Sequence, residues 1–305
     1  MPEFQCAVAS TERGEPVFAT ASQVRRWLLV EVRGSWGRDA VTNTDLGRHV
    51  SDEWRARLRA AGVRVVAIRR DLDRVADHTV RLFYIASGSG RSVGTVWRRD
   101  IAGLHAVVHA TESQPGDPGV DWTPHDGPLV LVCTNGRHDS CCATFGRPVV
   151  RALRASEHAD AVWECSHIGG DRFAGNVVVL PDGLYFGRCD AEVGVAVVDD
   201  YRRGVLDLDH YRGRSTLGFT HQAAEYFTRR HLDLTSIDAI TAVRRAGDPA
   251  DGTFVVDVSG SSAVTVTVRR TIGRAPAALT CSGPTDVALP RYELVEFRHD
   301  PARSA

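Results

Sequence analysis

The sequence predicts an α/β fold in which two successive β-α-β-β units precede a small β-rich region at the C-terminus. Three observations favour it: apolar runs suited to buried strands occur in both halves, a helical segment follows the first run of each half, and apolar and polar residues alternate after residue 253. The chain has 305 residues, of which 43% are hydrophobic and 25% are charged. This composition excludes disordered and fibrous proteins and suffices for two domains or one large composite domain.

The first unit is expected to span residues 1–111. Ser51 can accept a hydrogen bond at the start of its helix, and Gly62 can end that helix. The expected elements are a strand at 26–32, a helix at 52–61, and strands at 63–68 and 80–86.

Residues 112–127 are rich in proline and glycine, which favours a linker between the two units. The second unit, 128–233, repeats the order of the first, with a turn at Pro181-Asp182-Gly183 and a last helix that Thr220 can cap. Its expected elements are strands at 129–133 and 161–165, a hairpin of 176–180 with 184–188, and helices at 142–155 and 221–231. The repeated order suggests two thioredoxin-like units in tandem, with residues 234–305 as a small C-terminal β-rich appendage.

The charges are balanced, because 37 basic residues face 38 acidic ones. A formal net charge of -1 gives no reason to expect binding to nucleic acid or to an anionic membrane. No apolar run approaches the ~20 residues that span a bilayer, and residues 1–15 show no signal-peptide pattern. We therefore expect a cytoplasmic protein with no membrane span.

The seven cysteines are too few for a disulfide scaffold, and their odd number leaves at least one unpaired. Cys6, Cys189 and Cys281 stand apart and are interpreted as small buried apolar residues. The other four lie close together in the sequence, at Cys133, Cys141, Cys142 and Cys165. This concentration of thiols is the main chemical signal of the chain.

Cys133 ends a predicted strand and Cys142 opens a predicted helix, with eight residues between them. His167 follows a second strand and precedes the flexible pair Gly169-Gly170. Thiolates with an imidazole suit an iron-sulfur cluster or zinc, whereas calcium and magnesium prefer oxygen. No Cys-x2-Cys spacing of a zinc finger occurs, so iron-sulfur is favoured over zinc and over catalytic or merely buried cysteines.

Two segments, Cys133 to Cys142 and Cys165 to Asn176, resemble the sucrase/ferredoxin-like family, as do residues 14–16, 35–37 and 211–215. The resemblance extends over about residues 1–232. It implies a thioredoxin-like ferredoxin whose 2Fe-2S cluster is bound by Cys133 and Cys142. Fungal relatives supply the second ligand pair as His-x3-His, which here matches His167 and places Asp171 where the second histidine stands.

The fourth ligand has two candidates. Asp171 keeps the position of the family's second histidine. Cys165 offers the more suitable ligand atom, because a thiolate binds iron-sulfur clusters better than a carboxylate does. It lies two residues before His167, so in an extended strand the two side chains point to the same face. Either choice gives three anionic ligands and one neutral imidazole, and so a reduction potential between those of all-thiolate and Cys2His2 clusters.

The predicted function is one-electron transfer between a donating reductase and an acceptor that the sequence does not identify. Two alternatives remain: a thiol oxidoreductase with a reactive Cys141 or Cys142 at a helix start, and a zinc-binding structural protein. His138 and Asp139 are interpreted as a solvated imidazole and a helix cap. The Arg-rich segment 211–215 could cover the cluster or contact a redox partner, but an exposed loop before a helix is the favoured interpretation.

Overall fold

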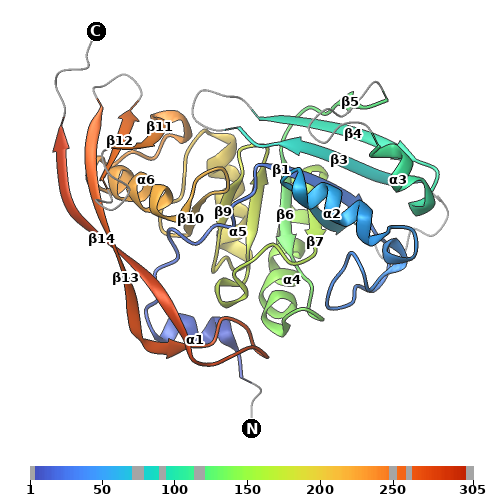
Figure 1. Cartoon of the computed structure of the whole chain (residues 1–305), viewed down its shortest axis with the longest axis horizontal. Coiled ribbons are helices and arrows are strands. Elements are labelled where there is room, and N and C mark those ends of the chain that lie inside the picture. Colours follow the sequence, from blue (N-terminus) through green and yellow to red (C-terminus); the bar gives the residue numbers. More distant parts are fainter. Residues whose placement is uncertain are drawn as a thin grey trace.

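The computed structural model describes residues 4–70, 79–88, 94–112, 121–246, 253–258 and 263–299, without the side chains of 274–276. It is a mixed α/β structure with one ten-stranded sheet and a separate four-stranded sheet formed near the C-terminus (Figure 1). Among the described residues, no helix is long and apolar enough to cross a membrane.

The first half begins with α1 (Cys6–Glu12) and continues into a unit in which one helix connects two parallel strands. Its further elements are β1 (Arg26–Glu31), α2 (Asp52–Ala60), β2 (Val63–Arg69), β3 (Val80–Ala86), β4 (Thr95–Ile101), α3 (Val107–Ala110) and β5 (Thr123–Pro124). The hydroxyl of Ser51 accepts from the backbone N–H of Trp54, and Gly62 has φ +70, so both predicted ends of α2 are confirmed.

The second half contains the thiol-rich segments. Its elements are β6 (Leu129–Cys133), α4 (Ser140–Arg154), β7 (Val162–Cys165), β8 (Val177–Leu180), β9 (Leu184–Phe186), α5 (Ala191–Arg202), β10 (Tyr211–Arg214) and α6 (Phe219–Leu232). A 3-10 turn, η4 (Asp171–Phe173), follows the glycine pair. Every residue of β6, β7, β8 and β9 is buried, which explains the continuous apolar runs of β6, β8 and β9; β7 contains one charged residue, Glu164.

The two halves pair their strands in the same order. In the first half the order is β2-β1-β3-β4, in the second it is β7-β6-β8-β9, and the first two strands of each set are parallel. The halves join where β2 and β7 pair antiparallel, with Ile68 opposite Cys165 and Arg69 opposite Glu164. An ion pair of 3.0 Å between the Arg69 and Glu164 side chains closes this junction.

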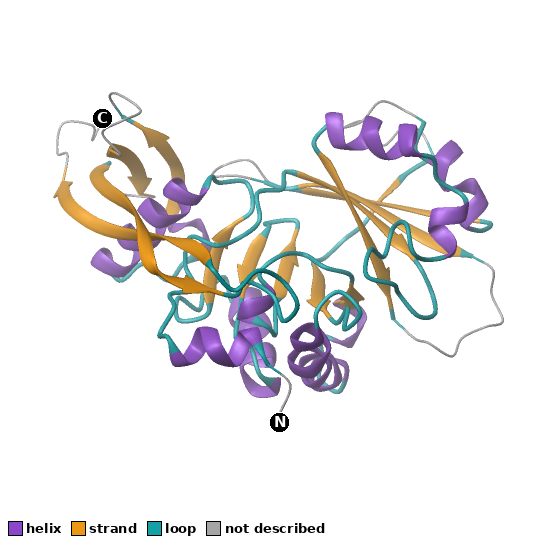
Figure 2. Cartoon of the chain, turned by 60° about the horizontal axis from the view of Figure 1, so that its bottom comes forward, coloured by secondary structure: helices purple, strands orange, loops and turns teal. Residues whose placement is uncertain are grey.

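The sheet halves pack face to face, with helices on the two outer sides (Figure 2). Trp27 and Phe83 of the first half share one buried cluster with Leu131 and Trp163 of the second. The rings of Phe83 and Trp163 meet edge to face, with centroids 5.5 Å apart. On the outer sides, α2 and α3 cover the first half and α4 and α5 cover the second.

The C-terminal sheet packs on α6. Its strands, in order, are β11 (Ile240–Arg245), β12 (Thr253–Val258), β13 (Val264–Ala277) and β14 (Val287–His299). Alternate residues of β12 are buried, and Phe254 and Val256 contact the cluster that contains Ala223 and Ala224 of α6. The long β13–β14 hairpin, red in Figure 1, reaches back to α1 at the other end of the chain.

Most predicted strands and helices are confirmed to within two residues, and three expectations differ. The last helix begins two residues early, at Phe219 after Gly218, so Thr220 is not its cap. The segment Tyr211–Arg214 is a buried edge strand instead of an exposed loop. Within the predicted linker, Thr123–Pro124 pairs with β4, while 113–120 lies outside the described residues. The unit boundaries and the thioredoxin-like character of each half stay predictions.

Candidate metal centre

The predicted ligands gather at the carboxyl ends of the parallel strands β6 and β7. Cys133 and Cys165 end these strands side by side and are fully buried. Asp139 caps α4 by accepting a 2.9 Å hydrogen bond from the backbone N–H of Cys141, which confirms its predicted role. A Cβ at Gly146 would overlap the carbonyl oxygen of Cys133, so glycine lets the helix lie against the strand end. This close approach places Cys142 beside Cys133.

Cys133 and Cys142 form a buried thiol pair. The hydrogen bond from Cys142 lowers the pKa of Cys133, and backbone N–H groups of Asn135 and Ile168 act in the same direction. The same hydrogen bond, together with burial, raises the pKa of Cys142. Cys142 Sγ also donates to Asp171 Oδ1 over 3.1 Å. The pair is therefore joined to the carboxylate of Asp171 through Cys142.

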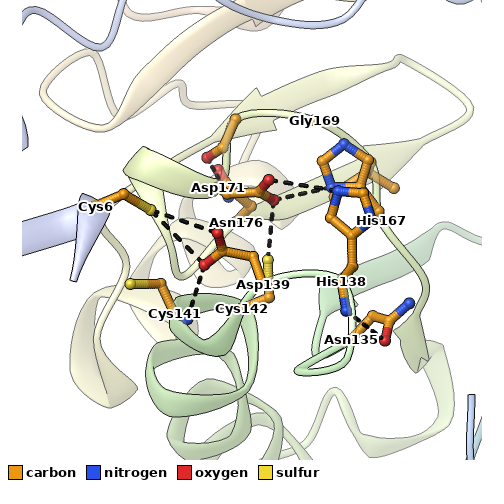
Figure 3. Close-up of polar contacts among 12 residues, drawn as sticks. Cys6, Asn135, His138, Asp139, Cys141, Cys142, His167, Gly169, Asp171 and Asn176 are labelled. Carbon is orange, nitrogen blue, oxygen red and sulfur yellow. Dashed lines mark hydrogen bonds and ion pairs between the residues drawn. The ribbon is translucent and has the colours of Figure 1, made fainter. Parts of the chain in front are cut away.

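Asp171 lies between the thiol pair and two imidazoles (Figure 3). Its side chain is 2% exposed, with Oδ1 2.9 Å from Nδ1 of His167 and Oδ2 3.5 Å from Nε2 of His138. Burial alone would raise the pKa of Asp171, but its contacts with the two imidazoles hold that pKa well below its usual range. In turn, the hydrogen bond to Asp171 raises the pKa of His138.

The two imidazole rings stack, with centroids 3.7 Å apart and an interplanar angle of 24°. Nδ1 of His138 lies 3.2 Å from the carbonyl oxygen of Arg38. Nδ1 of His167 is buried and lies 2.9 Å from Oδ1 of Asp171. Both imidazoles therefore have the same buried carboxylate as a neighbour.

The loop that carries His167 and Asp171 is held by its backbone carbonyls. Arg64 donates to the carbonyl of His167 over 2.9 Å, and Ser22 donates to that of Ile168 over 2.8 Å. The next two carbonyls, of Gly169 and Gly170, accept from Arg212 and Asn176. Gly169 and Gly170 have φ +98 and +84, so the bend requires glycine. Three of these donors, Arg64, Ser22 and Arg212, lie outside the thiol-rich segments.

Arg212 donates hydrogen bonds to this loop and is buried, whereas an exposed position was expected for it. Its side chain is buried, with 1% exposure, and burial lowers its pKa to about 10. The guanidinium donates to the Gly169 carbonyl over 2.9 Å, to Oδ1 of Asn176 over 2.7 Å and to the Thr20 carbonyl over 2.6 Å. The residue therefore acts as a positioning residue for the loop.

A cleft of about 720 Å³ opens beside the two imidazoles. His138 and His167 line it, each with about a quarter of the side chain exposed, at 25% and 29%. Most of the other lining residues belong to the first half, and among them Arg38, Arg59 and Asp39 are exposed. The imidazole side of the site thus faces solvent through a basic opening.

The structure brings together four of the five predicted site residues: Cys133, Cys142, His167 and Asp171. Cys165 lies next to Cys133 on the neighbouring strand. Among the described residues, His138, His167 and Asp171 have ligand atoms that all lie within 4.8 Å of one another, and none of Cys133, Cys142 and Cys165 belongs to that group. The sequence interpretation missed His138 as a site residue. Its place in the loop before Cys142 was the available signal.

Cys141 points away from this site. It meets Cys6 and Cys281, which were interpreted as isolated buried apolar residues, and Asp139 completes that second group. Cys142, rather than Cys141, is therefore the thiol beside Cys133.

We expect Arg212→Leu to lower the free energy of unfolding by about 3 kcal/mol or more, because each buried acceptor left without a donor costs about 1–3 kcal/mol. Arg147→Leu is the control, since Arg147 is exposed on α4, and its effect should stay within about 0.5 kcal/mol. Chemical denaturation followed by circular dichroism measures both. Equal effects of the two substitutions would contradict the positioning role of Arg212.

Comparison with known proteins places these observations in a family. The chain matches the model of the sucrase/ferredoxin-like family over residues 17–213. It is 32% identical over 96 residues to altered inheritance of mitochondria protein 32 of Meyerozyma guilliermondii, a match that covers 28% of this chain and 34% of that relative. Among solved structures, a thioredoxin-like [2Fe-2S] ferredoxin from Aquifex aeolicus aligns with 17% identity and a TM-score of 0.27, over 31% of this chain and 97% of the ferredoxin. Because the family match covers more than half of its 305 residues, the chain belongs to the sucrase/ferredoxin-like family.

Proposed function

We propose that this protein transfers single electrons through a 2Fe-2S cluster bound by Cys133, Cys142, His167 and Asp171. The observation that carries the proposal is a buried carboxylate, Asp171, that contacts the thiol of Cys142 over 3.1 Å on one side and Nδ1 of His167 over 2.9 Å on the other. When bound, such a cluster would supply a one-electron couple.

The donor set fits this group. Thiolates are the usual ligands of iron-sulfur clusters, and an imidazole can replace them on one iron. Cys133 and Cys142 are paired with each other, and His167 is paired with Asp171 across 2.9 Å, so the donors form two close pairs, as two irons require. Asp171 is preferred over Cys165 as the fourth ligand because it contacts both Cys142 and His167.

The surrounding residues control charge and water at the site. Backbone N–H groups of Asn135 and Ile168 stabilise the anionic form of Cys133, and Arg212 adds a buried positive charge behind the loop. The apolar cluster between the two halves excludes water on the thiol side. His138 and His167 face the cleft, so electron exchange is expected at the imidazole side.

The thiol oxidoreductase alternative is less well supported. A nucleophilic thiol at a helix start requires access, and Cys141 and Cys142 are both fully buried. The hydrogen bond with Cys6 lowers the pKa of Cys141 to about 6, whereas the hydrogen bond with Cys133 and burial raise the pKa of Cys142.

Metal and sulfide analysis tests the proposed ligands. Protein purified without oxygen should be brown and contain about two irons and two acid-labile sulfides per chain. Cys133→Ser, Cys142→Ser, His167→Ala and Asp171→Ala should each lose most of this iron, whereas Cys165→Ser and the control Cys189→Ser should keep it. Colourless protein would contradict the proposed function. Iron loss in Cys165→Ser, with retention in Asp171→Ala, would instead assign the fourth ligand to Cys165.

The reduction potential provides a second test. With three anionic ligands and one imidazole, we expect a midpoint between about -400 mV, typical of plant-type clusters, and the range of about -150 to +300 mV for Cys2His2 clusters. Because the second ring nitrogen of His167 can bind a proton when the site gains an electron, the midpoint should fall as pH rises, by at most about 59 mV per pH unit. Potentiometry between about pH 6 and 10 measures it. A constant midpoint would argue against His167 as a ligand.

We further propose that the reductase and the acceptor dock over the cleft with acidic surfaces, because Arg38 and Arg59 are exposed around the imidazoles. Oxidation of the reduced protein by anionic ferricyanide should be roughly tenfold slower in the double variant Arg38→Glu/Arg59→Glu. A cationic cobalt oxidant should not be slowed. The matched control is Arg151→Glu/Arg202→Glu, which makes the same charge change at exposed positions outside the cleft. Equal slowing in both double variants would contradict the docking face.

A further inference from the structure

A second group of candidate metal ligands lies on the other side of Cys142. It combines Cys6 of α1, Asp139 and Cys141 at the start of α4, and Cys281 between β13 and β14. One ligand atom of each residue lies within 4.8 Å of those of the other three. Figure 3 shows Cys6, Asp139 and Cys141 of this group, next to Cys142 and Asp171 of the first site.

The spacing of these atoms matches a tetrahedral site. Sγ of Cys281 lies 3.4 Å from Sγ of Cys141 and 3.6 Å from Sγ of Cys6. Oδ1 of Asp139 lies 3.1 Å from Sγ of Cys281 and 3.7 Å from Sγ of Cys6. Around a tetrahedral zinc ion, Zn–S and Zn–O bonds of about 2.3 and 2.1 Å separate two sulfurs by about 3.8 Å and a sulfur from an oxygen by about 3.6 Å. A small adjustment of side chains would suffice.

The carboxylate is already oriented toward the thiols. Oδ1 of Asp139 accepts a hydrogen bond of 2.9 Å from the backbone N–H of Cys141, and Oδ2 accepts one of 2.6 Å from that of Cys281. Such hydrogen bonds commonly orient the ligands of metal sites. Cys6, Cys141 and Asp139 are buried, whereas Cys281 is partly exposed and leaves a path for an ion to enter.

We propose that Cys6, Cys141, Cys281 and Asp139 bind one zinc ion that fixes the two ends of the chain to the start of α4. Three thiolates and one carboxylate form a complete four-ligand set, and thiolate-rich tetrahedral sites favour zinc. A disulfide would use only two of the three thiols and would leave the third thiol and the carboxylate in contact without a cation. Zinc would join Cys6 to Cys281, which are 275 positions apart in the sequence.

The test uses the full-length chain, purified without oxygen or added chelator, with zinc measured by plasma mass spectrometry. The wild type should contain about one zinc per chain. Cys281→Ser and Cys6→Ser should each reduce zinc occupancy about tenfold or more under the same dialysis. The control Cys189→Ser removes another buried thiol, which donates to the carbonyl of Gly187 over 3.9 Å, and should retain zinc.

The variant Cys133→Ser/Cys142→Ser removes the thiols of the first site and shows where the metal binds. After exchange with cobalt, this variant should show thiolate-to-cobalt charge-transfer absorption and the visible bands of a tetrahedral site, and these should disappear when Cys281→Ser is added. Three results would overturn the proposal: wild-type protein without zinc, zinc content unaffected by Cys281→Ser, or a native mass lower by two hydrogens, which indicates a disulfide in place of the ion.

Discussion

The candidate centre depends on the burial of one carboxylate. A buried ionised group is strongly destabilising unless it is paired, and Asp171 has its partners on two sides, the thiol of Cys142 and the imidazoles of His138 and His167. These contacts connect the end of β6, the start of α4 and the loop after β7. Satisfying Asp171 therefore constrains their mutual position, and the proposed cluster would take Asp171 and Nδ1 of His167 as neighbouring ligands.

The first half of the chain supplies part of this site although it contributes none of the proposed cluster ligands. Arg64 and Ser22 hold the carbonyls of His167 and Ile168, and Arg38 and Arg59 line the cleft in front of the imidazoles. The shared strand order of the two halves and their face-to-face packing make these contacts possible. We infer that the first half serves the second as a support for the ligand loop and as the rim of the opening. The zinc site proposed beyond Cys142 would add a further constraint, at the start of the same helix.

The sequence predicted the elements and contacts that depend on residues close together in the chain. The apolar runs that became β1 and β6 were recognisable because they are short and bounded by turn residues, and the approach of Cys142 to Cys133 followed from a strand end and a helix start separated by a short loop. Contacts distant in sequence were not predictable. Arg212 looked like an exposed residue in an Arg-rich loop, because the carbonyls that bury it belong to Thr20 and Gly169. The meeting of Cys6 with Cys281 depends on the path of the β13–β14 hairpin, and the stacking of His138 on His167 depends on the fold of two separate loops.

Magnetic resonance of the chemically reduced full-length protein tests the central claim most directly. The account predicts one electron paramagnetic resonance signal of a reduced 2Fe-2S cluster, with strong hyperfine coupling to a single histidine nitrogen. This coupling should persist in His138→Gln. In His167→Cys, either the coupling or the whole signal should disappear. Coupling to two histidine nitrogens would instead identify His138, in place of Asp171, as the fourth ligand. Two results would contradict an electron-transfer centre built on these residues. One is reduced protein that contains iron and sulfide but gives no paramagnetic signal, and the other is protein that contains neither iron nor sulfide.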